Sequence, residues 1–524
     1  MTYVVIGSGP AGVAAAQALA GAGHRVMVLD AGETIEAGRS SAFDLMAESE
    51  PESWPADLAQ SARGSFPVTA KHVPLKPAYG SLFAYALDDA DLPVSCEGAE
   101  TWPSLALGGL SNSWGASVLP VRRRDIHDWP VTLDELVPHY EAVLRFMPVA
   151  AEPDELSAIL PLYTSSPGRL RRTAQANMVL DHLRAHAAPL EAAGFHFGAS
   201  RLAVRTSDED PNRCRYSGLC LYGCPYRAIY NASHTLAALV RDRGVAYRGG
   251  VYIDRLVRTD GAVTIEAHER SRPSAAIRFT ASRVFVACGA LSSTRLMLAS
   301  MGCAPHALRL LDSQYFLIPM TTVQRVPVRT ATQGNTLAQV FLELDDARVS
   351  RYTAHMQLYG YNDLMLSPLA RRLRLGPDRL ERALQPLLGR AIVMQGYLHS
   401  ADSPGITIHT TARGVRLVGD DVRGGAKRVR SLVRRLMASA GSLGMAPIPG
   451  LVQVGRPGKG NHLGGSFPMR RRPGAMETDT LGRVPHWDRV HLVDASVLPS
   501  VPATTVTLSV MANAHRIATL AGVD

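Results

Sequence analysis

Three glycines near the start of the sequence, Gly7, Gly9 and Gly12, have the spacing of a turn that binds a diphosphate. In such a G-x-G-x-x-G turn, the first glycine permits a tight bend and the second lets the backbone approach a pyrophosphate. The third lets the following helix pack closely on a strand, and the helix N-terminus presents free N–H groups to the phosphates. The glycines therefore predict a dinucleotide-binding turn.

The segments around these glycines are those that the turn requires. Residues 3–6 have the pattern of a buried strand, residues 14–20 that of an alanine-rich helix, and residues 25–30 that of a second strand ending on Asp30. A carboxylate about 20 residues after the glycines can accept hydrogen bonds from both hydroxyls of an adenosine ribose. Asp30 therefore favours FAD or NAD over NADP.

Further motifs lie far along the chain. In residues 104–115, small residues flank Trp114, as expected where backbone lies against a flat ring; a glycine-rich turn beside a core tryptophan is the alternative. In residues 283–290, a strand closes on two small residues before a helix, a pattern that completes a Rossmann sheet at its cofactor edge. Near the C-terminus, His462 lies in a glycine-rich segment. It is followed by three further motifs: Asp479–Val484, Val490–Ser500 and Thr504–Asn513.

Taken together, these motifs resemble the GMC (glucose–methanol–choline) flavoprotein oxidoreductases. The resemblance covers the glycine turn, residues 108–115, the strand at 283–290 and residues 460–524, in the order of the family. It implies that FAD is the cofactor and that the protein is an enzyme. It also implies roles for particular residues. Gly7, Gly9, Gly12 and Asp30 would hold the ADP part, Gly109, Asn112 and Trp114 would line the isoalloxazine, and Asp494 and Ala495 would meet the ribityl–pyrophosphate region.

The resemblance also assigns a catalytic base. His462 matches the catalytic histidine of the family, because it opens a His-x-x-Gly-Ser motif and stands seven residues before Met469. Hydride transfer from a carbinol carbon to flavin N5 leaves a hydroxyl proton, which an imidazole can accept at neutral pH. Thr505 occupies the position where the family usually carries a second histidine or asparagine. A threonine hydroxyl can hydrogen-bond a substrate oxygen, but it cannot act as a base near pH 7.

Composition sets limits on partners and compartment. The chain of 524 residues carries a net charge of +9, and its basic residues are almost all arginines, without interleaved aromatics or a nucleic-acid motif. We therefore expect no nucleic-acid partner. Solvated helix faces explain the positive charge, and the alternative is that the charge binds an anionic substrate, a carrier or a membrane surface. No apolar run approaches the roughly 18–20 residues of a membrane span, and a cytoplasmic protein is expected.

The cysteines do not form a disulfide framework, since there are six in a long chain. Cys214, Cys220 and Cys224 lie close in sequence, and their spacing can place sulfurs around a metal. Iron–sulfur and structural zinc sites usually have four ligands, and no fourth is adjacent. We therefore assign no metal site and expect buried thiols, with a metal or a redox disulfide as alternatives. The segment also resembles cysteine-bearing branches of the family that look more like dehydrogenases than oxidases.

The remaining segments complete the predicted architecture. Residues 132–147 combine capping-box chemistry with an apolar helical stripe, and residues 36–80 are polar and turn-rich. Residues 315–445 carry strand patterns, at 321–326 and 391–397, around a basic amphipathic region at 361–388 that is expected to be a packed helix or lid. The prediction is an α/β protein in which a Rossmann-like FAD-binding domain is interleaved with an α+β substrate domain on an antiparallel sheet. The FAD domain is assigned residues 1–35, 81–130, 200–310 and 455–524, and the substrate domain is assigned residues 36–80, 131–199 and 311–454.

Three functions fit these observations. The leading prediction is an FAD-dependent oxidoreductase that takes hydride from the CH–OH group of a small molecule, such as a sugar or specialised metabolite, with oxygen, a quinone or a protein as electron acceptor. The second is desaturation, isomerisation or lyase chemistry on a biosynthetic intermediate, suggested by Thr505. The third is a flavin-holding protein without turnover, against which His462 argues.

Overall fold

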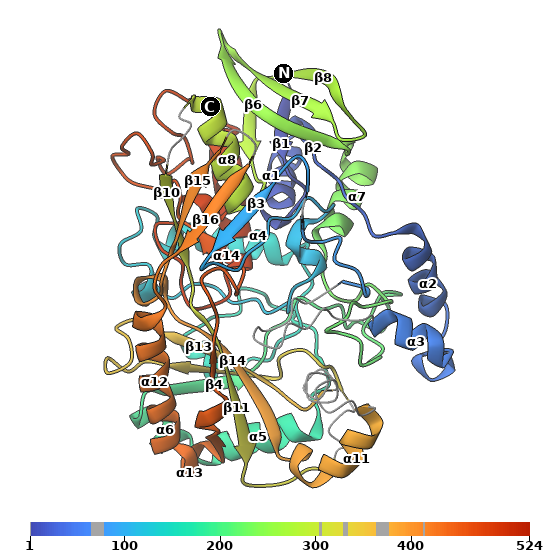
Figure 1. Ribbon diagram of the computed structural model, residues 1–524, viewed down its shortest axis with the longest axis vertical. Helices are drawn as coiled ribbons and strands as arrows, with labels where there is room; N and C mark the ends of the chain where they lie inside the picture. The colour runs from blue at the N-terminus through green and yellow to red at the C-terminus, as the bar shows by residue number, and fades with distance from the viewer. Residues whose placement is uncertain are drawn as a thin grey trace.

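The computed structural model describes residues 2–63, 78–87, 89–302, 307–327, 334–362, 377–411 and 414–523. Figure 1 shows two regions along the long axis, with both chain termini in the upper one. The upper region contains a parallel sheet, and the lower region is built on an antiparallel sheet. The predicted fold class, a Rossmann-like domain combined with an antiparallel-sheet domain, is confirmed.

The parallel sheet has the strand order β20–β9–β1–β2–β5. Its strands are β1 (Thr2–Ile6), β2 (Arg25–Leu29), β5 (Ala246–Arg248), β9 (Arg283–Val286) and β20 (Val490–Leu492). Parallel neighbours require a crossover, and α1 (Pro10–Gly21) supplies it between β1 and β2. On one side α1 packs against the C-terminal helix α14 (Thr507–Ala521), and on the other β1 and β9 contact a small antiparallel sheet. Because both faces are covered, the central strands β1, β2 and β9 are apolar along most of their length.

The predicted helix and strands of residues 232–300 are confirmed. The helix is α7 (Ala232–Arg243), the two strands are β6 (Val251–Thr259) and β9, and α8 (Ala290–Met301) follows β9. Strand β9 pairs in parallel with β1, as expected for a strand that completes the sheet. Three strands of this segment were not predicted: β5 of the parallel sheet, and β7 (Ala262–Glu269) and β8 (Arg272–Ala281), which form the antiparallel sheet β6–β7–β8 at the top of Figure 1.

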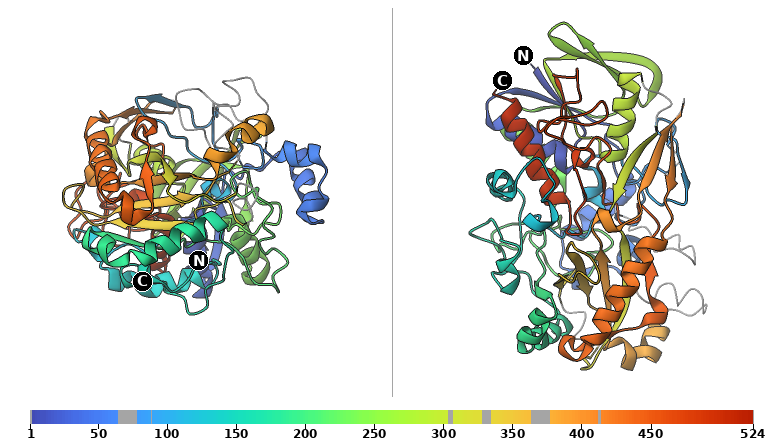
Figure 2. Two further views of the ribbon diagram at one scale, coloured as in Figure 1. Left: turned by 90° about the horizontal axis from the view of Figure 1, so that it is seen from below. Right: turned by 90° about the vertical axis from the view of Figure 1, so that its left-hand side faces the viewer.

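The lower region is organised by a seven-stranded antiparallel sheet. Its strands are β4 (Phe195–Ala199), β11 (Tyr315–Thr322), β12 (Val340–Leu344), β13 (Ala354–Tyr359), β14 (Ala391–Tyr397), β17 (Met445–Pro447) and β18 (Gln453–Val454). One face is apolar and forms a core with α5 (Ala174–Ala185) and α12 (Arg423–Ala438). The shorter helices α6 (Ala187–Ala192) and α13 (Ala440–Leu443) pack at the same end (Figure 2). The opposite face carries polar and aromatic side chains.

A further sheet joins segments from both predicted domains. Its strand order is β19–β10–β15–β16–β3. The bounds are β3 (Val94–Glu97), β10 (Ala307–Asp312), β15 (Ile406–Thr410), β16 (Val415–Gly419) and β19 (Leu463–Gly464). Strands β15 and β16 belong to the predicted substrate domain, whereas β3 and β19 belong to the predicted FAD domain. The domain boundaries therefore stay a prediction.

Several peripheral predictions can be compared with the structure. Helix α4 (Leu133–Leu144) begins after the predicted capping box of Thr132 and Glu135, so this prediction is confirmed. The turn-rich interpretation of residues 36–80 missed two helices, α2 (Ala37–Ala47) and α3 (Ala56–Arg63), which project to the right in Figure 1; residues 64–77 lie outside the described residues.

The strand predicted at 321–326 is wrong in its position, because β11 ends at Thr322. There the Thr322 hydroxyl donates to the carbonyl of Gln324 and turns the chain. The strand at 391–397 is confirmed as β14. The predicted amphipathic region contains α11 (Pro377–Leu388), while its residues 363–376 lie outside the described residues. Among the helices described, none is long and apolar enough to cross a membrane.

Candidate FAD site and active site

The glycine turn between β1 and α1 has the three distinct environments that its sequence predicts. Gly7 has a φ of +103°, and a Cβ there would lie 2.5 Å from the carbonyl oxygen of Ala287. A Cβ on Gly12 would lie 1.9 Å from the carbonyl oxygen of Gly7, so only glycine lets α1 approach the turn. A Cβ on Gly9 would meet only the Cα of Gly109, at 4.0 Å. Gly9 therefore borders open space, and the other two glycines are required by the protein itself.

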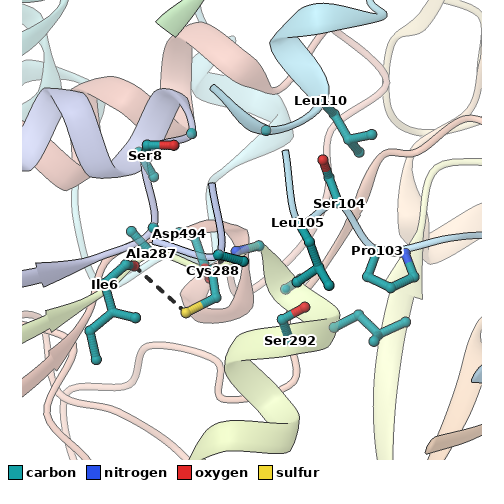
Figure 3. Close-up of a pocket in the computed structure, with 18 of the residues that line it drawn as sticks. Ile6, Ser8, Pro103, Ser104, Leu105, Leu110, Ala287, Cys288, Ser292 and Asp494 are labelled. Atoms are coloured by element: carbon teal, nitrogen blue, oxygen red, sulfur yellow. Dashed lines mark hydrogen bonds between the residues drawn. The ribbon is translucent and has the colours of Figure 1, made fainter. Parts of the chain in front are cut away.

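A cavity of about 240 Å³ lies beside this turn. Six of the residues predicted to hold FAD line it: Gly7, Gly9, Asp30, Gly109, Asp494 and Ala495. Figure 3 shows the part of the cavity wall between Ser8, Cys288 and Leu105. Gly12 lies beneath the turn, and Asn112, Trp114, His462 and Thr505 are not part of this wall. Asn461, Leu463 and Val506, which are the direct neighbours of His462 and Thr505, do line it.

Asp30 is held at the end of β2 by the turn itself. The Ser8 hydroxyl donates to Asp30 Oδ2, and the same hydroxyl accepts a hydrogen bond from the Gly108 amide at 2.8 Å. Burial raises the pKa of Asp30 to about 7, although the hydrogen bond from Ser8 opposes this. A buried carboxylate in the cavity wall is suited to accept hydroxyl donors from a ribose.

Asp494 connects segments of the cavity wall through hydrogen bonds to two backbone amides and one hydroxyl. Its Oδ2 accepts hydrogen bonds from the Gly289 amide at 2.8 Å and from the Ser293 hydroxyl at 2.5 Å. Its Oδ1 accepts from the Ser496 amide at 2.9 Å and caps the short helix η8 (Ala495–Val497). Burial raises the pKa of Asp494. This carboxylate therefore ties the start of α8 to the segment after β20.

Asn112 and Trp114 shape the loop that faces the cavity. Asn112 lies at the end of the short helix η2 (Gly109–Asn112), and its Nδ2 donates to the carbonyl oxygens of Leu107 and Gly109 at 2.9 and 2.8 Å. The indole Nε1 of Trp114 donates to the Tyr230 carbonyl at 2.9 Å. Both side chains are anchored by the protein, and the backbone of Gly109 is what reaches the cavity wall.

His462 lies where the cofactor cavity meets the antiparallel sheet. Its ring stacks on Tyr397 with the ring centroids 4.3 Å apart. Its Nδ1 is buried and has no hydrogen-bond partner among the described residues, although the residue as a whole is only half-buried. Desolvation lowers the pKa of His462 to about 3, with a smaller contribution from charge on His355. With its pKa lowered in this way, the imidazole is uncharged at neutral pH.

Tyr397, on which His462 stacks, also contacts the segment that carries Thr505. Tyr397 packs against Ala503, two residues before Thr505. The hydroxyls of Thr504 and Thr505 are buried and have no hydrogen-bond partner in the described part of the chain. The segment that carries these two hydroxyls continues into Val506, which lines the cavity, as Asn461 and Leu463 do on either side of His462.

The sequence interpretation missed the polar face of the seven-stranded sheet. His355, Gln357 and Tyr359 on β13 alternate with Met356 and Leu358, which point into the apolar core. This period-two alternation was the signal that could have found them. It also missed two residues of the cavity wall, Arg295 and Tyr252, whose guanidinium and ring are 4.8 Å apart.

The three clustered cysteines line a second, much smaller cavity of about 10 Å³. All three are free thiols. Burial raises the pKa of Cys214 to about 12 and that of Cys224 to about 11. In the part of the chain that is described, no group of three His, Cys, Asp or Glu residues is arranged to hold a metal ion.

Comparison with known proteins identifies the cofactor. A family described as "FAD binding domain" matches residues 2–308. The chain belongs to this family. FAD is thus the cofactor, and the chain is an FAD-binding enzyme of the oxidoreductase type. No curated protein matches the sequence significantly.

The fold also matches a solved structure over its whole length. The crystal structure of pyridoxine 4-oxidase from Mesorbium loti superposes with a TM-score of 0.60, covering 99% of this chain and 98% of that chain at 16% identity. At this identity the match establishes the fold alone. The prediction of an FAD-binding fold is confirmed. Of the predicted GMC assignment, the comparisons support that the protein is an FAD oxidoreductase. The membership of the GMC family and the roles of individual site residues stay predictions.

Proposed function

We propose that this FAD enzyme belongs to the GMC oxidoreductases and oxidises the CH–OH group of a small molecule, with His462 as the catalytic base. The observation that carries the proposal is the half-buried side chain of His462, whose buried Nδ1 has no hydrogen-bond partner among the described residues and whose neighbours Asn461 and Leu463 line the cofactor cavity. A nitrogen without a protein partner at the edge of such a cavity is suited to bind a substrate hydroxyl.

The chain's residues fit FAD at the glycine turn. Gly9 leaves open space for a pyrophosphate, and the N-terminus of α1 lies directly after it with no side-chain cap. Asp30 offers a buried carboxylate to the ribose, and Asp494 and Ala495 form the adjoining wall. The bound flavin supplies the hydride acceptor for the reaction.

The proton step follows from the environment of His462. Because burial lowers its pKa to about 3, the ring is neutral at working pH and can accept the hydroxyl proton. A negative charge developing on the substrate oxygen attracts the imidazolium and opposes the desolvation that disfavours it. The Thr505 hydroxyl can donate a hydrogen bond to the same oxygen, but it takes no part as a base.

Thr505 also motivates a second candidate function. With one base in place of the usual pair, FAD-dependent desaturation, isomerisation or a lyase step is the alternative. The two candidates differ in the final state of the flavin. Anaerobic mixing with a substrate leaves reduced flavin in an alcohol oxidation, whereas a redox-neutral reaction returns oxidised flavin together with a rearranged or cleaved product.

The deciding experiment compares His462→Ala with a matched control. His491 on β20 is a buried histidine whose Nε2 has no hydrogen-bond partner among the described residues, and burial lowers its pKa to about 4, but neither it nor its direct neighbours Val490 and Leu492 line the cavity. We expect His462→Ala to retain FAD and to slow anaerobic flavin reduction by roughly 10²- to 10⁴-fold, the range of general-base catalysis. His491→Ala should retain the rate. Full activity of His462→Ala would refute the mechanism.

A further inference from the structure

Two neighbouring strands lead away from His462 on the face of the seven-stranded sheet opposite its apolar core. Tyr397, the last residue of β14, stacks on His462, and Tyr315 on β11 is its partner in the strand register. From this pair, β11 and β14 run side by side toward the lower end of the molecule in Figure 1. Because side chains alternate between the faces of a sheet, every second residue of each strand continues the face that the two tyrosines begin.

The side chains that continue this face are mostly apolar, and we call the apolar ones the apolar strip. They lie along β11, along β14 and along β17, which pairs with β11 at the edge of the sheet. The apolar strip consists of Leu317, Pro319, Val323, Val393, Ala391, Ala446 and Ile448. The other two residues of the face are Gln395 and Thr321. Gln395 is engaged within the protein, because its Nε2 donates to the Tyr397 hydroxyl at 2.7 Å.

The apolar strip is partly open to solvent. Leu317, Pro319 and Val393 are half-buried, and the exposed fraction reaches 38% for Ile448 and 66% for Val323. The solvated face of an antiparallel sheet normally carries polar side chains, because only the other face packs on a core. Single exposed apolar residues are common, but a contiguous row of them indicates a binding surface. Packing of the fold therefore does not account for the apolar strip.

Leu317 connects the apolar strip to the candidate active site. It packs against a buried cluster that consists of Tyr315, Tyr397 and Ala503. Tyr397 in turn stacks on His462, with the ring centroids 4.3 Å apart. Apolar surface is thus continuous from the ring beside the imidazole to the exposed end of the sheet. A ligand held at His462 can extend along it.

The apolar strip is narrow. On one side, His355, Gln357 and Tyr359 of β13 share the same face of the sheet but are buried. On the other side, β17 is at the edge of the sheet. The spacings of residues and strands give a strip roughly 20 Å long and 10 Å wide, about 200 Å², whereas each partner of a stable protein interface contributes about 800 Å². The strip therefore fits one extended chain better than a second protein.

We propose that the substrate is an alcohol with a long, unbranched apolar chain, which lies along the apolar strip while its hydroxyl group reaches His462. The proposal rests on the proposed oxidation at His462 and names the substrate class of that site. Continuity with the ring stacked on His462 points to the substrate as the occupant, and the width of the strip points to a linear chain. A small sugar would leave the strip unused.

The first experiment compares butanol, octanol and dodecanol as substrates of the FAD-loaded protein. Anaerobic flavin reduction gives kcat/KM for the reductive step with each alcohol. We expect kcat/KM to rise roughly two- to fourfold per added methylene, from the free energy of removing a methylene group partly or fully from water. Equal values for butanol and dodecanol would overturn the proposal.

The second experiment places a polar group in the middle of the strip. Val393 lies four residues from Tyr397, about 14 Å along the strand, where a long chain reaches it and butanol does not. Val393→Asn should lower the ratio of kcat/KM for dodecanol to that for butanol by roughly tenfold, because several methylenes lose apolar contact. Val393→Thr keeps the shape of the side chain and guards against misfolding. It should lower the same ratio by about threefold.

Val418→Asn is the matched control. Val418 on β16 is also a half-buried valine with paired strands on both sides, but it belongs to another sheet. The control should leave the ratio for dodecanol and butanol unchanged. An equal fall of the ratio in Val393→Asn and Val418→Asn would overturn the role of the strip, and so would an unchanged ratio in both Val393 variants.

The third experiment measures binding without turnover. The fluorescent polyene cis-parinaric acid is titrated into the FAD-loaded protein and then displaced by tertiary alcohols, which have no hydrogen on the carbinol carbon and cannot be oxidised. Dodecyl dimethyl carbinol should displace the probe at concentrations at which tert-butanol does not. Val393→Asn should weaken binding of the probe, whereas Val418→Asn should not. Absence of probe binding to the unaltered protein would overturn the proposal.

The outcomes separate this proposal from the proposed function. If none of the alcohols reduces the flavin but the long tertiary alcohol displaces the probe, the proposed oxidation fails and the apolar strip stands as a chain-binding surface. If butanol and dodecanol reduce the flavin equally well and the probe does not bind, the oxidation stands and the strip fails. A changed oligomeric state of Val393→Asn in light scattering, without probe binding, would assign the strip to a second copy of the chain and overturn the proposal.

Discussion

The glycine turn allows a prediction that separates cofactor binding from folding. Gly9→Ala and Gly12→Ala introduce the same methyl group three residues apart. At Gly9 the new Cβ meets only the Cα of Gly109 at 4.0 Å, and the φ of −67° with ψ of 179° is accessible to alanine. At Gly12 the new Cβ would lie 1.9 Å from the carbonyl oxygen of Gly7, a backbone atom that cannot move without separating α1 from β1.

The magnitudes follow from these distances. For Gly12→Ala we expect the free energy of unfolding of the FAD-free protein to fall by about 3 kcal/mol or more, the upper range for overpacking. The gain in helix propensity of alanine, below about 1 kcal/mol, does not offset this. Gly9→Ala should change the stability of the FAD-free protein by less than about 1 kcal/mol. Its methyl group occupies the space that a pyrophosphate approaches, which should weaken FAD binding roughly 5- to 150-fold, or about 1–3 kcal/mol.

The assay uses two measurements on each FAD-free variant. Urea unfolding gives the stability, and titration with FAD, followed by the quenching of flavin fluorescence, gives the dissociation constant. Gly9→Leu should abolish binding altogether. Wild-type affinity for FAD in Gly9→Ala would refute the assignment of the pyrophosphate site. Normal stability of Gly12→Ala would refute the close approach of helix and turn.

Four further predictions concern single features. FAD affinity should rise with pH between about 6 and 8, because burial raises the pKa of Asp30 to about 7 and ribose hydroxyls prefer the ionised carboxylate. In FAD titrations across that range, Asp30→Asn should remove this dependence. For the same reason, the contribution of Asp30 to the stability of the FAD-free protein is present below about pH 4 and is lost as pH rises through 7. Cys214 and Cys224 should resist alkylation at pH 8 in the folded protein, because their raised pKa values leave little thiolate. They should react once the protein unfolds, and mass spectrometry can follow both reactions. Thr132→Ala should lower stability by about 1 kcal/mol in thermal or urea unfolding, because it removes the capping box of α4.

Local signals predicted the cofactor half of the fold well. The unit β1–α1–β2 needs only glycine spacing, an apolar strand pattern and an acid at the end of β2, all within the first 30 residues. The capping box of α4 is equally local. Strand β14 was also predicted with its observed bounds, because it begins with an apolar run at residues 391–394.

Cross-strand contacts could not be predicted in the same way. The neighbourhood of Tyr397, His355 and Glu343 depends on the register of three strands, which a single sequence does not specify. The position of the strand predicted at 321–326 was wrong for a related reason, since a side-chain hydrogen bond from Thr322 ended β11. The motif that identified His462 likewise says nothing about the aromatic ring on which it stacks.

The backbone around His462 explains how one residue can serve both regions of the molecule. The Ser313 amide, at the junction of β10 and β11, donates to the carbonyl of His462 at 3.3 Å, and Asp312 on β10 accepts from the Gly458 amide at 3.0 Å. On the other side, the Gly465 amide donates to the carbonyl of Ala495 in the wall of the cofactor cavity at 2.9 Å. The segment that carries His462 is therefore fixed by main-chain hydrogen bonds to both. Because these bonds do not involve its side chain, substitution of His462 should remove the base without displacing either the cofactor cavity or the polar face of the sheet.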